Sequence, residues 1–187
     1  MWILFSKGFS MKKIDELREL VKSDAVKYGK FVLASGRESD LYVDLRKVTL
    51  NPRGAFLIGS IIFDLIKDRS PDAVGGMSLG ADPIAVATSL IAYQSGQTIN
   101  AFLVRKGKKE HGTKNMIEGP IFPGQRVVVV EDVITTGSST INAIEHIEDA
   151  GLVVDMVIGV LDRTEGGRQA IEDLGYNVHA ILERKDL

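Results

Sequence analysis

The spacing of apolar residues in the first third of the chain predicts two helices with an antiparallel segment between them. Apolar residues recur at helical spacing between charged residues over residues 12–23, which predicts an amphipathic helix. Residues 31–48 mix short apolar runs with turn-forming residues, which favours a hairpin or a small antiparallel cap over a core strand. Asn51-Pro52 breaks this segment, and the apolar spacing from Phe56 to Ile66 predicts the second helix.

From residue 72 onward, strands and helices alternate along the chain. Strands are predicted at residues 73–77, 99–104, 126–131, 156–161 and 178–182. The helices between them are predicted at residues 82–93, 139–150 and 167–174. Asp82 is the expected N-cap of the first of these helices, with Pro83 at its first helical position, and Gly151 is the expected C-cap of the second. This alternation implies a parallel, doubly wound sheet, so the expected fold class is α/β.

The composition narrows the classes of protein to consider. The chain has 187 residues, which is within the usual range for one domain, so we expect residues 1–187 to form a single domain. It has no cysteine, which excludes disulfide scaffolds, thiol catalysis and Cys-ligated zinc. The formal net charge of −2 argues against a nucleic-acid partner, because such proteins more often carry a basic excess. No apolar run approaches the about 18 to 20 residues of a spanning helix, so we expect no membrane partner and a cytoplasmic location.

The first ten residues are expected to be an extension of the domain. Residues 1–5 are apolar, but they lack a basic region before them and are interrupted by Ser6-Lys7-Gly8, unlike a signal peptide. Met11 is therefore a more natural start of the chain.

The richest chemical motif lies at the end of the apolar run 127–130. Glu131 and Asp132 follow this run, and a loop of Thr, Gly and Ser leads from them into a helix. Ligands of open α/β sheets bind at the carboxyl ends of strands, and backbone amides at a helix N-terminus bind phosphate. Because adjacent acids accept hydrogen bonds from sugar hydroxyls, the combination predicts a ribose 5-phosphate site. The alternative is that the acids merely cap a turn and that the loop is an ordinary helix cap.

A second motif is the basic segment 105–114. It holds five cations and one His within ten residues of a chain that is slightly acidic overall. Most charge runs are solvated loops. A mobile cationic loop would also neutralise a departing pyrophosphate and exclude water from the reaction, which is the interpretation that the first motif favours.

Together these motifs resemble a known family. The apolar strand, the two acids and Thr135-Thr136-Gly137-Ser138 resemble the phosphoribosyl pyrophosphate (PRPP) motif of the type I phosphoribosyltransferases. Arg105-Lys106-x-x-Lys109-x-His111-Gly112 is similar to the catalytic loop of the orotate phosphoribosyltransferases. The resemblance extends over residues 12–184. It implies a type I phosphoribosyltransferase-like fold in which residues 11–50 form an N-terminal helix and a small hood over the substrate, and residues 51–187 form the α/β core.

The resemblance implies an activity and a set of site residues. The activity is transfer of the 5-phosphoribosyl group from PRPP to orotate, which gives orotidine 5'-monophosphate and pyrophosphate in de novo pyrimidine (UMP) biosynthesis. The catalytic residues that it implies are Lys109, His111 and Asp132. The PRPP-binding residues that it implies are Arg105, Lys106, Lys109, His111, Glu131, Asp132, Val133, Ile134, Thr135, Thr136, Gly137, Ser138 and Ser139. The orotate-binding residues that it implies are Thr135 and Arg163, since an Arg fork matches a carboxylate.

The resemblance also implies a cofactor and a partner. Mg²⁺ would be held mainly by PRPP rather than by protein ligands. The partner would be a second copy of the chain, in a homodimer that shares loop 105–114 across its interface. Arg105, Lys109 and His111 would then act in the neighbouring subunit, and Lys106 in its own.

Two positions depart from the family's pattern. Many relatives have Lys where Ala34 stands here, and many have another Lys where Gly80 stands. Either Arg37, Arg46, Lys47 or Lys108 compensates, or backbone amides and Mg²⁺ hold the pyrophosphate. The sequence leaves both possibilities open.

Two other functions compete with this hypothesis. The chain could transfer phosphoribosyl groups to a purine or another base, although the hood and the basic loop argue against it. It could also be a PRPP-sensing regulator that has lost catalysis, but such a protein should carry an added nucleic-acid-binding element, and only residues 1–10 are extra here. His146 and His179 are expected to be ordinary helix or surface residues.

Overall fold

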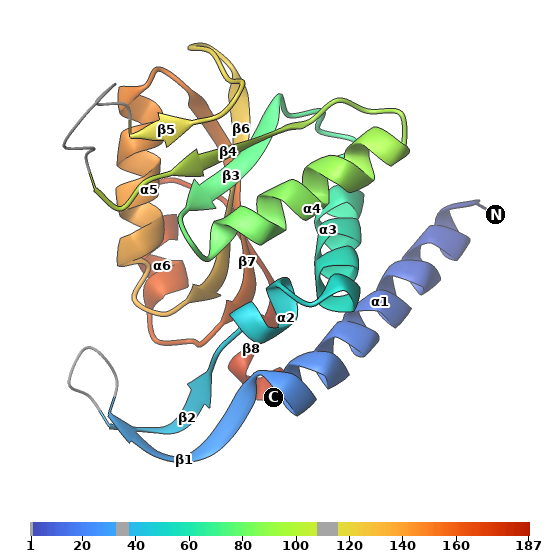
Figure 1. The fold of residues 1–187 in the computed structure, drawn as a ribbon, viewed down its shortest axis with the longest axis vertical. Coiled ribbons are helices and arrows are strands. Elements are labelled where there is room, and N and C mark those ends of the chain that lie inside the picture. The colour runs from blue at the N-terminus through green and yellow to red at the C-terminus, as the bar shows by residue number, and fades with distance from the viewer. Residues whose placement is uncertain (1, 33–37, 108–115) are drawn as a thin grey trace.

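The computed structural model describes residues 2–32, 38–107 and 116–187, and its centre is a six-stranded sheet (Figure 1). The strands follow the spatial order β5-β4-β3-β6-β7-β8. Their bounds are β3 Ala73–Met77, β4 Asn100–Val104, β5 Ile117–Glu118, β6 Arg126–Ile134, β7 Val153–Asp162 and β8 Val178–Glu183. All neighbouring pairs are parallel except β4 and β5, which are antiparallel. The prediction of an α/β fold with a mainly parallel sheet is confirmed.

Helices cover both faces of this sheet. Their bounds are α1 Trp2–Asp24, α2 Arg46–Thr49, α3 Pro52–Ile66, α4 Ala81–Gln94, α5 Ser138–Asp149 and α6 Gly167–Glu172. Helices α3 and α4 pack together on one face, and α5 and α6 lie on the other (Figure 1). A short 3₁₀ helix, Arg184–Asp186, ends the chain. None of the helices in the described part of the chain is long and apolar enough to cross a membrane.

Strand β6 shows why the sheet is buried on both sides. Val128 and Val130 pack into the core on the α3 and α4 face, whereas Val127 and Val129 pack into the core on the α5 face. Side chains alternate between the faces of a strand, so a continuous apolar run provides both faces at once. This doubly covered strand brings the residues that follow the run to the edge of the sheet.

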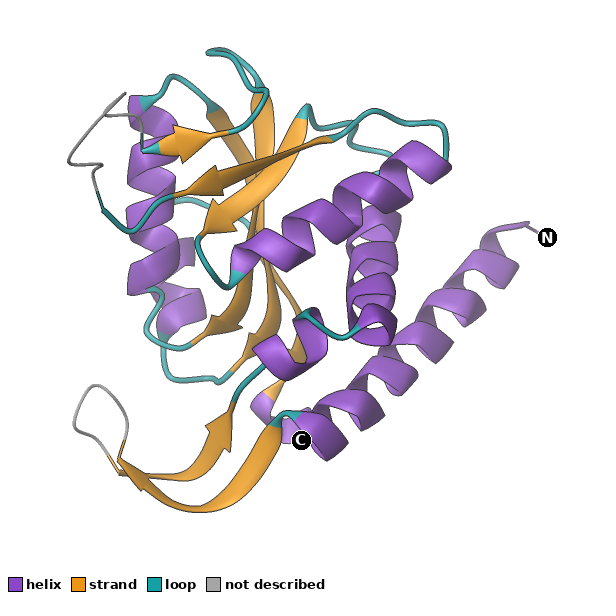
Figure 2. Ribbon diagram, viewed as in Figure 1, coloured by secondary structure: helices purple, strands orange, loops and turns teal. Residues whose placement is uncertain are grey.

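The N-terminal segment forms a helix and a separate hairpin. Strands β1 (Val26–Val32) and β2 (Glu38–Val43) are antiparallel and project away from the central sheet (Figure 2). This confirms the predicted hairpin, which we call the hood; its residues 33–37, including Ala34 and Arg37, lie outside the described residues. Helix α1 begins at Trp2, ten residues before the predicted start. The prediction missed this part of the helix because the apolar spacing that indicated it begins only at Ile14.

Several boundaries differ from the predicted ones. The N-cap of α4 is Gly80 rather than Asp82, which lies inside the first turn and accepts a hydrogen bond of 2.9 Å from the Ser78 hydroxyl. Strand β6 continues to Ile134, three residues beyond its predicted end at residue 131, so Asp132 also lies within the strand. Short β5 and α2 were not predicted, because two or four residues are too few to show a hydrophobic period.

Candidate active site

A cavity of about 340 Å³ lies at the carboxyl ends of β3 and β6. Four parts of the chain line it. They are the end of the hood and the start of α2 (residues 43–46), the loop after β3 (residues 77–80), Lys106, and the segment that carries the acids and the phosphate loop. We define the phosphate loop as residues 135–139. Arg163 at the end of β7 completes the wall. The cavity therefore joins the two chemical motifs of the sequence to the hood.

Glu131 and Asp132 form the acidic part of this wall. Only 5% of Glu131 is exposed, and its Oε2 accepts a hydrogen bond of 3.1 Å from Oγ1 of Thr140. Burial, the neighbouring charge of Asp132 and a hydrogen bond between the two side chains raise the pKa of Glu131 to about 8. The half-buried Asp132 accepts a hydrogen bond of 2.8 Å from the backbone N–H of Val133. Glu131 therefore favours its protonated form near neutral pH.

The start of α6 packs against the phosphate loop and holds it in place. Gly137 is the N-cap of α5 and has φ of 79°, a left-handed conformation that glycine adopts without strain. The backbone N–H of Gly167 donates a hydrogen bond of 2.9 Å to the carbonyl of Thr135. A Cβ at Gly167 would overlap this carbonyl, so the two glycines let α6 pack directly on the loop. The loop is therefore preformed, with the N-terminal amides of α5 beside it.

Not every residue of the predicted phosphate motif lines the cavity. Val133, Thr135 and Ser139 do so, together with Glu131 and Asp132. Ile134 points into the core instead, and its carbonyl accepts a hydrogen bond of 3.0 Å from the backbone of Arg163. The hydroxyls of Thr136 and Ser138 lie 3.1 Å apart on the exposed side of the loop.

Arg163 links the cavity to the hood. Its side chain is buried, and Nη2 lies 2.8 Å from Oε1 of Glu165 and 3.4 Å from the carbonyl oxygen of Leu41 in β2. The ion pair between Arg163 and Glu165 is thus largely buried rather than solvated at the surface. A buried guanidinium at the cavity wall is suited to bind a carboxylate.

The two described cations of the basic segment lie in different surroundings. Lys106 lines the cavity with the acids. Arg105 does not line it; its Nη1 lies 3.5 Å from Oε1 of Glu118 in β5, beside a neighbouring depression lined also by Leu79. Lys109 and His111 lie outside the described residues, so their predicted roles stay predictions.

The hood side of the cavity was the least predictable part of the site. Asp44 and Arg46 line the cavity, and Nε of Arg46 donates a hydrogen bond of 2.8 Å to Oδ1 of Asp44. The sequence indicated Arg46 as one of four cations that could compensate for Ala34 and Gly80, and Asp44 only as part of the segment that resembles the hood. A Cβ at Gly80 would lie 2.5 Å from Oδ1 of Asp132, so the loop after β3 packs tightly on the acid pair.

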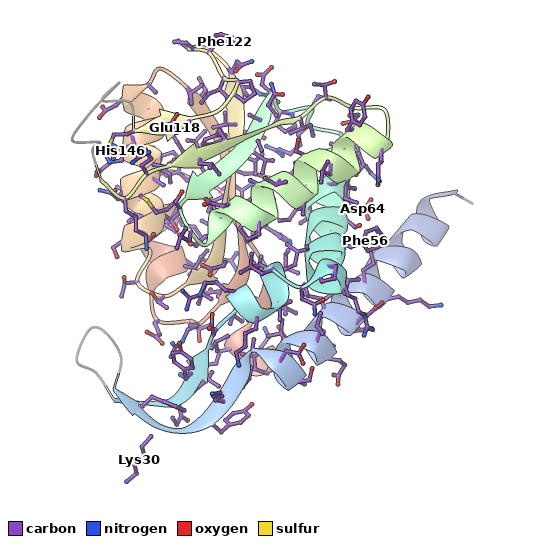
Figure 3. All side chains as sticks on the ribbon, viewed as in Figure 1. Lys30, Phe56, Asp64, Glu118, Phe122 and His146 are labelled. Atoms are coloured by element: carbon purple, nitrogen blue, oxygen red, sulfur yellow. The ribbon has the colours of Figure 1, made fainter. Side chains whose placement is uncertain are left out.

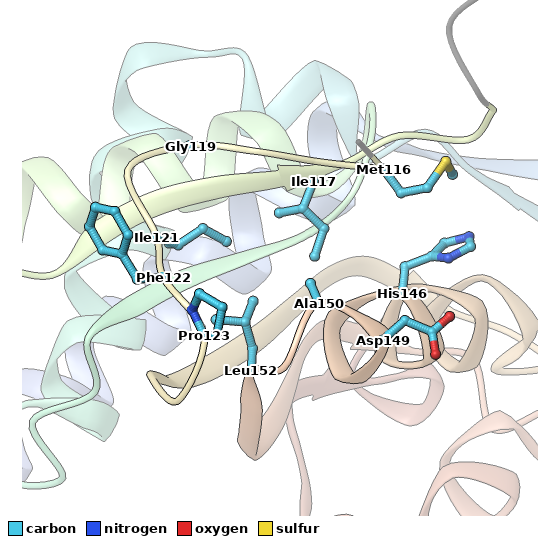
Figure 4. Close-up of a pocket in the computed structure, with 10 residues that line it drawn as sticks. All are labelled: Met116, Ile117, Gly119, Ile121, Phe122, Pro123, His146, Asp149, Ala150 and Leu152. Atoms are coloured by element: carbon cyan, nitrogen blue, oxygen red, sulfur yellow. The ribbon is translucent and has the colours of Figure 1, made fainter. Parts of the chain in front are cut away.

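A second cavity, of about 490 Å³, lies elsewhere, between β5 and the C-terminal half of α5 (Figure 4). Ile117 and Leu152 form part of its apolar wall, and His146 and Asp149 stand at one side of it (Figure 4). Glu118 and His146 lie on the side of the molecule away from the hood, whose Lys30 is labelled at the other end (Figure 3). None of the predicted site residues that the structure describes lines this cavity.

The described residues contain no cluster of three or more His, Cys, Asp or Glu side chains with the arrangement of a metal site. The cavity nevertheless offers two carboxyl groups, those of Glu131 and Asp132, to a cation that arrives with a ligand.

Comparisons with known proteins agree on one family. A model of the phosphoribosyl transferase domain matches residues 46–173. The orotate phosphoribosyltransferase of Tropheryma whipplei is 47% identical over 173 residues, which cover 92% of this chain and 81% of that protein. A crystal structure of the orotate phosphoribosyltransferase of Mycobacterium tuberculosis has a TM-score of 0.82 and 44% identity, over 93% of this chain and 98% of that one. A structure of the same enzyme in complex with PRPP has a TM-score of 0.78 and 41% identity, over 93% and 98% of the two chains.

Proposed function

The chain belongs to the orotate phosphoribosyltransferases, and on this premise we propose that the cavity at the ends of β3 and β6 binds PRPP and orotate together. One observation carries this proposal: the acid pair, the phosphate loop and the buried Arg163 line a single cavity. Each of the three recognises a different part of the two substrates.

The 5'-phosphate of PRPP would bind at the phosphate loop, where the N-terminal amides of α5 and the Ser139 hydroxyl are available. The ribose hydroxyls would lie at Glu131 and Asp132, whose carboxyl oxygens accept hydrogen bonds. Orotate would place its carboxylate at Arg163 and its ring near Thr135. This arrangement puts the anomeric carbon between the base and the basic segment.

The reaction is displacement at that anomeric carbon, through a transition state with positive charge on the sugar, by analogy with glycoside cleavage. The acid pair would supply negative potential beside the sugar. Lys106 would stabilise the charge that develops on the departing pyrophosphate, because it lines the same cavity. The sequence predicts that Lys109 and His111 join it there. No covalent nucleophile is required.

We propose Mg²⁺ as the cation that accompanies PRPP. Mg²⁺ is usually bound through one or two carboxylates together with substrate phosphates and water. The donor set fits that arrangement, with Asp132, the more exposed of the two acids, as the residue that would contact the ion or its waters. Bound in this way, the ion would neutralise part of the pyrophosphate charge.

A homodimer is the second part of the proposal, and an apolar stripe on α4 supports it. Val86, Leu90 and Tyr93 are 49%, 59% and 77% exposed and recur at spacings of four and three residues along one face of the helix. Leu79, which is 69% exposed, lies in the loop just before it. We call these four residues the α4 stripe. Large exposed apolar groups in a row are typical of an interaction surface. Leu79 lines the cavity and also the depression beside Arg105, so a second copy docked on the stripe would lie next to the site.

The test of the activity is loss of orotate, followed by ultraviolet absorbance, in the presence of PRPP and Mg²⁺. Adenine, hypoxanthine and uracil serve as control bases. PRPP-dependent loss of orotate alone is the expected result. Turnover of another base would contradict the choice of orotate, and folded protein that binds PRPP but converts no base would favour a PRPP-sensing regulator. The cytoplasmic location that we expect from the sequence stays a prediction.

A further inference from the structure

Arg46 stands at the cavity wall without a role in the function described so far. It is the first residue of α2, directly behind the hood strand β2, and it lines the cavity with Lys106 and the acid pair. The charge of Asp132 contributes to raising the pKa of Arg46, after the larger effect of Asp44. Arg46 therefore lies within electrostatic reach of the acid that faces the substrate.

Asp44 holds the Arg46 guanidinium by one edge. Nε of Arg46 donates to Oδ1 of Asp44 at 2.8 Å, and the Arg46 backbone N–H donates to the same oxygen at 3.3 Å. Asp44 is in turn fixed by its backbone N–H, which donates to the carbonyl of Ala25 at 3.0 Å. Within the described part of the chain, the Arg46 side chain pairs with Asp44 alone. Both terminal nitrogens of the guanidinium thus keep their N–H donors for a ligand.

The substrate group that these donors fit follows from the rest of the cavity. A guanidinium with two free nitrogens suits phosphate oxygens or a carboxylate. The 5'-phosphate has the amides of the phosphate loop, and the orotate carboxylate has Arg163. The described cations that line the cavity are Arg46, Lys106 and Arg163. Arg163 is assigned to orotate, so only Lys106 has so far been assigned to the pyrophosphate. Arg46 is the other cation on that wall.

We propose that Arg46 binds the pyrophosphate group of PRPP and that Asp44 positions its guanidinium. The proposal rests on the proposed function, since it assigns a residue to a substrate of that reaction. It also answers the question left by Ala34 and Gly80, because a cation from the hood side takes the place of the two that the sequence lacks.

The neighbouring Lys47 offers a matched control. It follows Arg46 in the same short helix and is also exposed, but it does not line the cavity. It lies instead at an outer depression beside Leu50 and Pro52. A general effect of positive charge near the site would be lost equally in Arg46→Ala and Lys47→Ala, whereas a direct contact would be lost only in the first.

The experiment measures binding of inorganic pyrophosphate and of ribose 5-phosphate by calorimetry, and the KM for PRPP, in Arg46→Ala, Arg46→Lys and Lys47→Ala. Loss of a charge-assisted hydrogen bond should weaken pyrophosphate binding by about 10- to 100-fold in Arg46→Ala. Ribose 5-phosphate binding should stay within about twofold, since that ligand lacks the pyrophosphate group. Arg46→Lys should recover part of the affinity, and Lys47→Ala should match the unmodified chain.

The positioning role of Asp44 has its own readout. Asp44→Ala should weaken pyrophosphate binding several-fold in the unmodified background and should have no further effect on it in Arg46→Ala. An additional loss in the double variant would show that Asp44 acts independently of Arg46 and would contradict its role.

Two outcomes would overturn the assignment of Arg46. One is Arg46→Ala protein that binds pyrophosphate as tightly as the unmodified chain, and the other is an equal loss of pyrophosphate and ribose 5-phosphate. Either result in a chain that converts orotate would leave the proposed function intact. An unmodified chain that binds neither PRPP nor pyrophosphate would overturn both proposals together.

Discussion

The hydroxyl of Thr140 donates a hydrogen bond of 3.1 Å to the carboxyl group of Glu131, and both residues are buried. Thr140 lies in the first turn of α5, so the helix that follows the phosphate loop also orients the acid that we propose binds the ribose. This hydrogen bond stabilises the ionised form of Glu131 and opposes the burial that raises its pKa.

Thr140→Val should therefore raise the pKa of Glu131 further and lower turnover at pH 7 by about tenfold, the effect of one hydrogen bond to a buried charge. The pH profile of kcat/KM should move to higher pH, and Thr140→Ser should restore it. A lower rate with an unchanged profile would mean that Thr140 acts only through packing.

Glu131 should also make the stability of the empty enzyme depend on pH. Its pKa of about 8 in the folded chain lies above the usual 4.5, so between these values the folded chain keeps a proton that the unfolded chain has released. Folding then becomes less favourable as the pH rises through this interval. Glu131→Gln removes the titrating group, and its unfolding temperature should rise relative to that of the unmodified chain from pH 5 to pH 8. Glu145→Gln, on the exposed face of α5, is the control, and a difference that stays constant with pH would refute the assignment.

Gly167→Ala should damage the phosphate site although Gly167 itself does not line the cavity. The new Cβ would overlap the Thr135 carbonyl and lie 2.5 Å from the Gly137 nitrogen, so the loop must move. A shift of the phosphate by about 1 Å can cost up to about 100-fold in rate, and we expect the KM for PRPP to rise at least about tenfold. Gln169→Ala, on the exposed side of the same helix, should leave the KM unchanged. Equal KM values in both variants would show that the loop tolerates the side chain.

Leu90→Glu should convert the proposed dimer to monomers, because it places a charge in the centre of the α4 stripe. Sedimentation velocity would measure the change. Leu174→Glu, at a residue that is 56% exposed after α6, is the control and should remain dimeric. A Leu90→Glu protein that is still a dimer would place the interface on another surface.

Sharing of loop 105–114 between subunits predicts a specific mixing result. Lys109→Ala and Asp132→Asn should each be nearly inactive alone, and a mixture that exchanges subunits should regain activity, because one site of each hybrid has both residues intact. If exchange is demonstrated and the activity does not return, the loop serves its own subunit.

The sheet, the helices between its strands and the acid pair could be predicted from the sequence because they depend on local patterns. The apolar run before Glu131 reports a strand buried on both faces, and the residues that follow such a run must reach the edge of the sheet. The wall made by the hood was not predictable in the same way. Arg163 meets Leu41 across 122 residues, and Arg105 turns to Glu118 rather than to the acid pair. Such contacts depend on how distant segments pack, and the spacing of apolar residues along the chain carries no information about that packing.

The link between Arg163 and Leu41 has a consequence for how the molecule folds. The hood lies outside the central sheet, yet the Tyr28 hydroxyl donates to the carbonyl of Leu187, and Arg184 pairs with Asp40 at 2.7 Å. The first hairpin of the chain is thus tied to the residue after β7 and to the 3₁₀ helix that follows β8. A nascent chain on the ribosome contains the hairpin long before these partners are synthesised, so the hood side of the cavity can form only after Arg163 and residues 184–187 have been added.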